Sequence, residues 1–144
     1  MIRRFGEDIQ RGVRYEYRPG VYAILPKGEN LLLTHQADPF DEIQLPGGGI
    51  DPNEHPIAAL HREVYEETGW TIANPRRIGA HRRFCFMPEY DKWAEKVCHI
   101  YIAKPVKKRS EPLEAGHTAL WLHQSDAIHL VNSEGSRAFL ANLK

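Results

Sequence analysis

Residues 47–70 constrain this chain more than any other stretch, because a glycine-rich turn runs directly into an amphipathic segment. Pro56 fits the first turn of a helix, where its missing N–H loses no hydrogen bond, and Gly69 fits a left-handed cap after the last turn. Between them, apolar residues recur at helical spacing on one side: Ile57, Leu60 and Val64. The pattern predicts a helix over residues 56–68 that packs through this side.

Another side of the predicted helix carries three carboxylates, those of Glu63, Glu66 and Glu67. At about 100° per residue they span an arc of roughly 100°, and the small Ala59 leaves this arc uncovered. Like charges four residues apart destabilise a helix by about 0.2–0.5 kcal/mol, and negative charge is unfavourable near a helix C-terminus. A solvated acidic face explains most such groups. A bound divalent cation would remove both penalties, and Mg²⁺ prefers carboxylates together with water and phosphate oxygens.

The turn and the helix together resemble the signature of the Nudix hydrolases, MutT-like enzymes. That signature is a glycine, five residues, a glutamate, seven residues, Arg-Glu, an aliphatic residue, one residue, Glu-Glu, one residue, a glycine and an apolar residue. The chain matches every spacing over 23 of its 144 residues, with Gly48, Glu54, Arg62, Glu63, Val64, Glu66, Glu67, Gly69 and Trp70. Trp70 departs mildly from the aliphatic residue usual in the family, and Asn53 replaces a common glycine but tolerates left-handed backbone angles.

The resemblance implies a metal site with Mg²⁺ as its cofactor and Mn²⁺ as a substitute. The expected ligands are the Gly47 carbonyl and the carboxylates of Glu63, Glu66 and Glu67. Gly48 and Gly49 would let the backbone approach the metal and the substrate phosphates. Arg62 would orient Glu54 or Glu66, the alternative being an ordinary surface ion pair. Glu54 would either cap the helix or assist metal binding.

The general base is open, because family members use either a glutamate of the signature or one in a distant loop. Glu114 is the first candidate in such a loop and Glu111 the second, with an ordinary solvated position as the competing interpretation. Glu63 is the alternative within the signature. Pro112 and Gly116 give the loop shape and a hinge, which would allow closure over bound substrate.

Substrate-binding residues outside the signature are predicted from residue type alone. Arg82, beside Arg83 on a predicted strand, is a candidate for binding phosphate. Tyr90, with Trp93 in the same loop, is a candidate for stacking on a base. Ordinary surface packing is the alternative for each. None of the eight histidines is assigned to zinc, because no element carries two at ligand spacing.

The remaining pattern predicts one mixed α/β (α+β) domain over residues 1–144, with a mixed β-sheet sandwiched between α-helices. The predicted strands are residues 13–18, 21–25, 31–35, 77–87, 97–103 and 117–122. Pro19-Gly20 should separate residues 13–18 from residues 21–25, and residues 21–25 should form a hairpin with residues 31–35. Residues 44–49 should form no regular element and residues 104–116 an exposed loop. Two helices are expected near 125–130 and 134–143, the latter capped by Asn132 or Ser133.

The composition of the chain bears on which binding partners and which cellular compartment are expected. The 19 basic and 19 acidic residues balance, so no overall field attracts a nucleic-acid polymer or an anionic membrane. Cys85 and Cys98 lack metal-ligand spacing and are interpreted as free thiols. The N-terminal residues lack the apolar core of a signal peptide, and no segment has the length of a membrane span. A cytoplasmic protein, monomeric or homodimeric, is expected.

The expected activity is metal-dependent hydrolysis of a pyrophosphate bond in a small molecule, a nucleoside diphosphate linked to another moiety X. The main alternative is a nucleotide-binding regulator of the same fold that does not turn over substrate. Loss of a signature carboxylate would favour it, and all are present. Isomerase chemistry on a diphosphate lipid precursor is a third reading, with less support because its further catalytic residues are not found.

Overall fold

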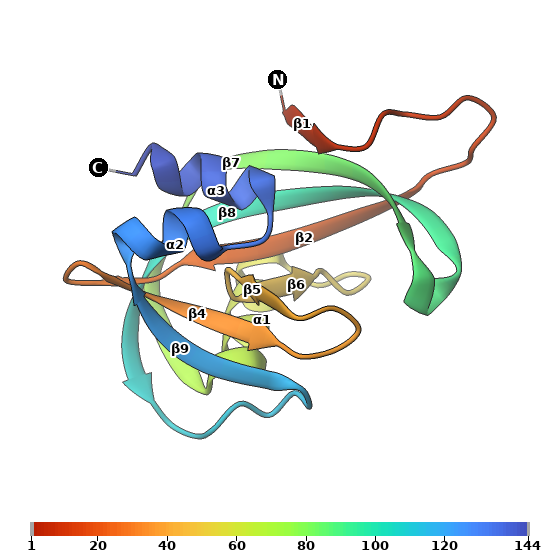
Figure 1. Ribbon diagram of the computed structural model, residues 1–144. Helices are drawn as coiled ribbons and strands as arrows, with labels where there is room; N and C mark the ends of the chain where they lie inside the picture. The colour runs from red at the N-terminus through yellow and green to blue at the C-terminus, as the bar shows by residue number, and fades with distance from the viewer. Residues whose placement is uncertain (1, 144) are drawn as a thin grey trace.

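A computed structural model describes residues 2–143, and Figure 1 shows its elements. The strands of this part of the chain are β1 (Arg3–Gly6), β2 (Glu16–Ile24), β3 (Pro26–Lys27), β4 (Asn30–Gln36), β5 (Glu42–Gln44), β6 (Gly47–Gly49), β7 (Trp70–Met87), β8 (Lys92–Lys108) and β9 (His117–His123). The helices are α1 (Pro56–Thr68), α2 (Gln124–Leu130) and α3 (Glu134–Ala141), with a short 3₁₀ turn η1 (Pro88–Tyr90).

The strands form two sheets. The larger has the order β1-β7-β8-β2-β6 and is mixed, because β1 is parallel to β7 and β2 to β8 while the other neighbours are antiparallel. The smaller is antiparallel and places β4 between β9 on one side and β3 and β5 on the other. This arrangement confirms the predicted mixed α+β architecture.

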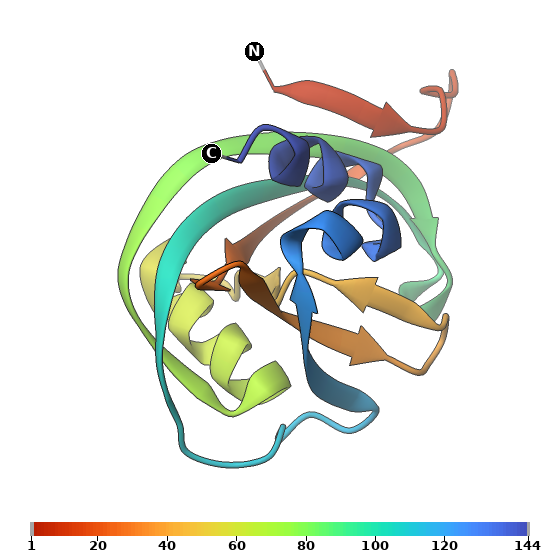
Figure 2. The same ribbon diagram turned by 60° about the vertical axis from the view of Figure 1, so that its left-hand side comes forward.

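Alternation along β2 and β4 divides the apolar side chains between two cores. Val21 and Ala23 of β2 and Leu32 of β4 pack with α1. Their neighbours in the sequence point the other way and pack with α2 and α3: Ile24, Leu31 and Leu33. In Figure 2 the yellow-green helix α1 and the blue helices α2 and α3 accordingly lie on opposite sides of these orange strands. The predicted sandwich between helices is confirmed.

Helix α1 has the predicted bounds, because its signals are local. The His55 side chain accepts a hydrogen bond from the Ile57 backbone N–H, and Gly69 ends the helix with a φ of 77°. Leu60 and Val64 are fully buried, whereas Ile57 is half-buried against the same core. The helix therefore packs through the predicted side.

The prediction that residues 44–49 form no regular element was wrong. Gln44 ends β5, and Gly47–Gly49 forms β6, which pairs antiparallel with β2. The backbone groups of the glycines find partners in a distant strand, which local sequence cannot reveal. Nor does Pro19-Gly20 interrupt the first strand: β2 runs through both residues, and a Cβ on Gly20 would lie only 3.0 Å from the Gly48 carbonyl oxygen.

The predicted hairpin of residues 21–25 with 31–35 was right at its turn, where the Leu32 N–H donates to the Leu25 carbonyl at 3.0 Å, but wrong in its extent. Strands β2 and β4 belong to different sheets, and the hairpin is formed by the two-residue strand β3 with the start of β4. Strands β7 and β8 are longer than predicted, so that residues 104–108 extend β8 rather than belonging to a loop. The two strands stay paired from Trp70 with Lys108 to Met87 with Lys92, although the register shifts near Ala73 and Gly79.

The C-terminal helices agree with the prediction, and Ser133 is the cap of α3, accepting a hydrogen bond from the Ser136 N–H. Cys85 and Cys98 are free thiols that pair in register with Ala94 and His81 respectively, not with each other. Within residues 2–143 there is no helix with the length and apolar character needed to cross a membrane.

Candidate active site

Helix α1 presents its three carboxylates at different depths. The side chain of Glu67 is 7% exposed, that of Glu63 12% and that of Glu66 36%. Glu67 accepts a hydrogen bond of 2.9 Å from the Gly47 backbone N–H, which ties the helix to β6. The deepest carboxylate is therefore held against the glycine strand, and the shallowest lies at the solvent edge.

The glycines of β6 allow this close packing. A Cβ on Gly48 would lie 2.6 Å from the carboxyl carbon of Glu63, and one on Gly47 would lie 2.1 Å from the Val21 carbonyl oxygen. Neither position has room for a side chain. Asn53, in the turn before α1, has the left-handed φ of 65° that its residue type tolerates.

Arg62 organises the outer carboxylates. Its guanidinium donates to both oxygens of Glu54 at 2.8 and 2.9 Å, to Glu63 at 2.9 Å and to the Gly49 carbonyl at 3.1 Å. It also contacts Glu66 at 3.3 Å. These bonds lower the pKa of Glu54 to about 2. Arg62 thus contacts both residues that it was predicted to orient, and the bidentate pair is with Glu54.

Glu114 joins the helix carboxylates from the loop before β9. The backbone N–H groups of Leu113 and Glu114 donate to the Glu66 carbonyl oxygen at 2.8 and 2.9 Å, which fixes the loop on the last turns of α1. The Glu114 carboxylate lies with those of Glu63 and Glu66, with ligand atoms within 4.8 Å of one another. Glu111, the second candidate, instead pairs with Lys108 at 2.6 Å and is largely exposed.

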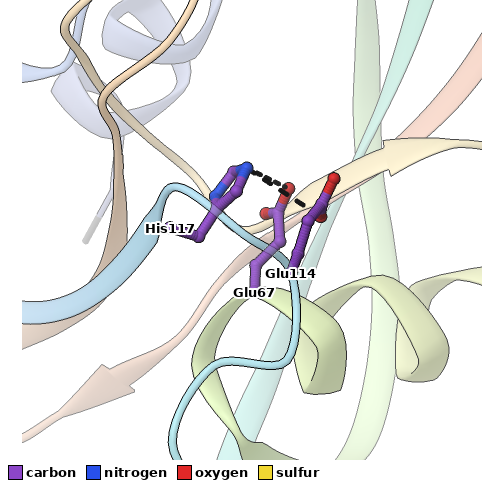
Figure 3. A group of neighbouring side chains, drawn as sticks. All are labelled: Glu67, Glu114 and His117. Atoms are coloured by element: carbon purple, nitrogen blue, oxygen red, sulfur yellow. Dashed lines mark ion pairs between the residues drawn. The ribbon is translucent and has the colours of Figure 1, made fainter.

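His117 is a member of this cluster that sequence reasoning missed. Its side chain is 5% exposed, and its Nε2 lies 3.7 Å from Glu67 and 3.8 Å from Glu114 (Figure 3). Its Nδ1 lies 2.9 Å from the hydroxyl oxygen of Thr34, which is fully buried. The pairing of β4 with β9 brings Thr34 and His117 together, and the only local signal was a threonine in the otherwise apolar run LLLTH.

The ligand atoms converge in two overlapping groups within residues 2–143. Glu63, Glu66 and Glu114 form one group and Glu67, Glu114 and His117 the other, and in each group the ligand atoms lie within 4.8 Å of one another. Burial raises the pKa of Glu67 to about 9 and raises that of Glu63, with neighbouring carboxylates adding to both shifts. Buried oxygen ligands that repel one another fit a divalent cation, which would stabilise their charged forms.

The predicted substrate residues outside the signature make other contacts. Arg82 pairs with Glu95 at 3.6 Å and lies over the Phe84 ring. The guanidinium carbon of Arg18 lies over the Tyr90 ring, 4.6 Å from the ring centroid. Neither contact involves a member of the carboxylate cluster.

Two curated proteins match about half of this chain in sequence. An RNA pyrophosphohydrolase of Halorhodospira halophila is 37% identical over 68 residues, which are 47% of this chain and 38% of that protein. A Bacillus subtilis protein, provisionally named an 8-oxo-dGTP diphosphatase, is 37% identical over 74 residues, 51% of this chain and 49% of that protein. The matched region thus spans less than half of these curated relatives.

Solved structures extend the likeness to nearly the whole chain. A MutT NUDIX hydrolase from Burkholderia pseudomallei superimposes with a TM-score of 0.72 at 19% identity, covering 90% of this chain and 99% of that one. A NUDIX hydrolase from Nitrosomonas europaea gives 0.71 at 17% identity, covering 88% and 86%. At these identities the likeness concerns the fold. The model of the NUDIX domain matches residues 16–143, and the chain therefore belongs to the NUDIX domain family.

Proposed function

We propose that this chain is a metal-dependent pyrophosphohydrolase that cleaves a phosphoanhydride bond in a nucleoside diphosphate linked to another moiety X. One observation carries the proposal: Glu114 of the distant loop converges with Glu63 and Glu66 in one group of ligand atoms, and with Glu67 and His117 in another, with the atoms of each group within 4.8 Å of one another. Cleavage of such a bond requires that negative charge on the leaving phosphate be neutralised and that water become nucleophilic. A divalent cation supplies both when bound, by Lewis acidity and by lowering the pKa of its water.

The proposed roles of the residues in the cluster follow from how deeply each side chain is buried. Glu67 and Glu63, the most buried carboxylates of α1, are the proposed principal ligands of Mg²⁺ or Mn²⁺, joined by Glu66 and the Gly47 carbonyl. Arg62 holds Glu63 and Glu66 through its guanidinium while its bidentate pair with Glu54 fixes its own position. Gly48 and Gly49 leave the backbone of β6 open to substrate phosphates, and Arg82 and Tyr90 remain candidates for contact with the rest of the substrate.

Glu114 is the proposed general base. It is 47% exposed, so it reaches solvent, and its backbone is fixed to α1 through the Glu66 carbonyl. Glu111→Gln is the matched comparison from the same loop, because its carboxylate pairs with Lys108 and not with the cluster. Glu114→Gln should lower kcat by about 10²–10⁴-fold, and Glu111→Gln should not. An unchanged kcat in Glu114→Gln would return this role to Glu63.

The substrate class is tested with a panel of compounds. The purified protein is incubated with Mg²⁺ and with nucleoside triphosphates, 8-oxo-dGTP, dinucleoside polyphosphates, nucleotide sugars and a 5′-triphosphorylated RNA oligomer. Products are identified by ³¹P NMR, and ¹⁸O-labelled water locates the phosphorus attacked. We expect two phosphorylated products from a small nucleotide derivative. Preferred cleavage of the RNA oligomer would overturn the small-molecule assignment, and binding without cleavage of any compound would favour the regulator.

A further inference from the structure

We propose that His117 is a nitrogen ligand, through its Nε2 atom, of the divalent cation held by Glu67 in the site that Glu114 borders. This inference refines the metal site of the proposed function, since the signature supplies only oxygen ligands. Mixed nitrogen and oxygen ligation favours later first-row ions such as Co²⁺ over Mg²⁺, because imidazole is a softer ligand than carboxylate or water.

The spacing between His117 and Glu67 supports a shared ion better than a direct contact, with Glu114 beside them. Nε2 lies 3.7 Å from a Glu67 oxygen and 3.8 Å from a Glu114 oxygen, too long for hydrogen bonds. Two ligand atoms bound at about 2.1 Å to one ion lie roughly 3.4 Å apart at a tetrahedral angle and about 4.2 Å apart when opposite. The observed separations fall between these limits. Figure 3 shows the imidazole and both carboxylates directed toward one another.

The other side of the imidazole is already held. The Thr34 hydroxyl lies 2.9 Å from Nδ1, and Thr34 is fully buried in β4. If Nδ1–H donates to this hydroxyl, the lone pair of Nε2 faces the carboxylates. Metal-bound histidines are commonly oriented in this way by a hydrogen bond from the second ring nitrogen. The His117 side chain is only 5% exposed, so the imidazole lies inside the site and not at its edge.

The position of His117 distinguishes it from the other histidines. Within residues 2–143, no other histidine belongs to a group of three ligand side chains whose atoms lie within 4.8 Å of one another. His129, for example, is exposed on α2. His129→Gln is therefore the matched control for His117→Gln: the chemical change is the same and the cluster is untouched.

The experiment uses Co²⁺ alone, without nucleotide. Proton NMR of the Co²⁺-loaded wild type should show one strongly shifted, exchangeable histidine N–H resonance, confirmed by ¹⁵N-histidine labelling. The resonance should remain in His129→Gln and vanish in His117→Gln. By calorimetry, the ratio of Co²⁺ to Mg²⁺ affinity should fall about tenfold or more in His117→Gln. Thr34→Val should lower Co²⁺ affinity by a smaller factor, because it removes only the group that orients the ring.

The outcomes separate this inference from the hydrolase proposal. Co²⁺ binding with no shifted histidine resonance would mean an all-oxygen site, which overturns the role of His117 and leaves the hydrolase proposal intact. A resonance that persists in His117→Gln would overturn it equally. If His117→Gln does not fold, the wild-type spectrum alone decides. Absence of hydrolysis in the substrate panel, with the resonance present, would overturn the proposed function and not the ligand.

Discussion

Glu67 and His81 lie on opposite faces of the larger sheet. Counted over the whole residue, backbone included, they are 5% and 4% exposed and so almost equally buried. Burial raises the pKa of Glu67 to about 9 and lowers that of His81 to about 4, so that each neutral form is favoured. Their surroundings differ. Glu67 faces the carboxylate of Glu114 and the imidazole of His117, whereas His81 packs between the rings of Phe5 and Phe139.

The comparison shows that burial of an ionisable group does not by itself mark a functional site. Both ring nitrogens of His81 lack a hydrogen-bond partner within residues 2–143, and a Cβ on Gly135 would lie 2.3 Å from Nδ1. Nothing there can stabilise its charged form. At Glu67 a cation would do so, because further carboxylates and an imidazole lie within reach. At the proposed metal site a cation would replace the proton of Glu67, whereas His81 on the other face remains neutral.

The largest expected effect comes from replacing Glu67, the buried carboxylate of the comparison. Glu67→Gln should lower kcat by about 10³-fold, the size expected when an electrostatic stabiliser of the transition state is removed. It should also raise the melting temperature of the metal-free protein, because a buried carboxylate is lost while the bond from the Gly47 N–H can be kept. Glu29→Gln, exposed beside His123, is the control. Steady-state kinetics and calorimetry measure both effects, and activity close to wild type would contradict the assignment.

The next effect tests whether the two faces are held by comparable cores. Leu60 is 0% exposed on the α1 side and Leu140 2% exposed on the α3 side. Each Leu→Ala replacement should lower the free energy of unfolding by about 2–5 kcal/mol, measured by urea denaturation. A loss below about 0.5 kcal/mol for Leu60→Ala would mean that α1 is oriented differently.

A third prediction concerns pH. His81 has an ordinary pKa near 6.5 in the unfolded chain and about 4 in the folded one, so the unfolded state binds the proton first as pH falls. Stability should decrease between about pH 6.5 and 4 by roughly 3 kcal/mol from this residue. His81→Leu should show a smaller decrease over that window in denaturation experiments. A decrease of equal size in the variant would assign the effect to other groups.

The smallest effect concerns the helix that packs against His81. The Ser133 hydroxyl caps α3 by accepting from the Ser136 N–H. Ser133→Ala should cost about 1 kcal/mol of stability without changing kcat, because the cap lies on the face away from the carboxylates. A change in kcat with an unchanged denaturation midpoint would contradict this separation of the two faces.

Features encoded by neighbouring residues were predictable from the sequence. The bounds of α1 follow from Pro56, the apolar spacing and Gly69, all within one segment. The arc of the three helix carboxylates follows in the same way, since helical geometry alone places them on one side. Glu114 was placed in a loop correctly, and its approach to the cluster depends on two backbone hydrogen bonds to Glu66.

Features that depend on distant pairing were not predictable. His117 enters the cluster because β9 pairs with β4, which sets Thr34 behind its ring. Gly47–Gly49 becomes a strand because β2 supplies its partners, although three glycines predict irregular structure. In both cases the deciding contacts join residues far apart in the chain, and one sequence contains no record of their register.

The two hydrogen bonds from the loop to the Glu66 carbonyl have a consequence for the thermodynamics of substrate binding. A catalytic carboxylate on a free loop would lose conformational entropy each time the loop became ordered over a substrate. Here that entropy is lost once, when the chain folds, because Leu113 and Glu114 are fixed to the helix that carries the other carboxylates. Substrate affinity therefore need not compensate for ordering the backbone at these two residues.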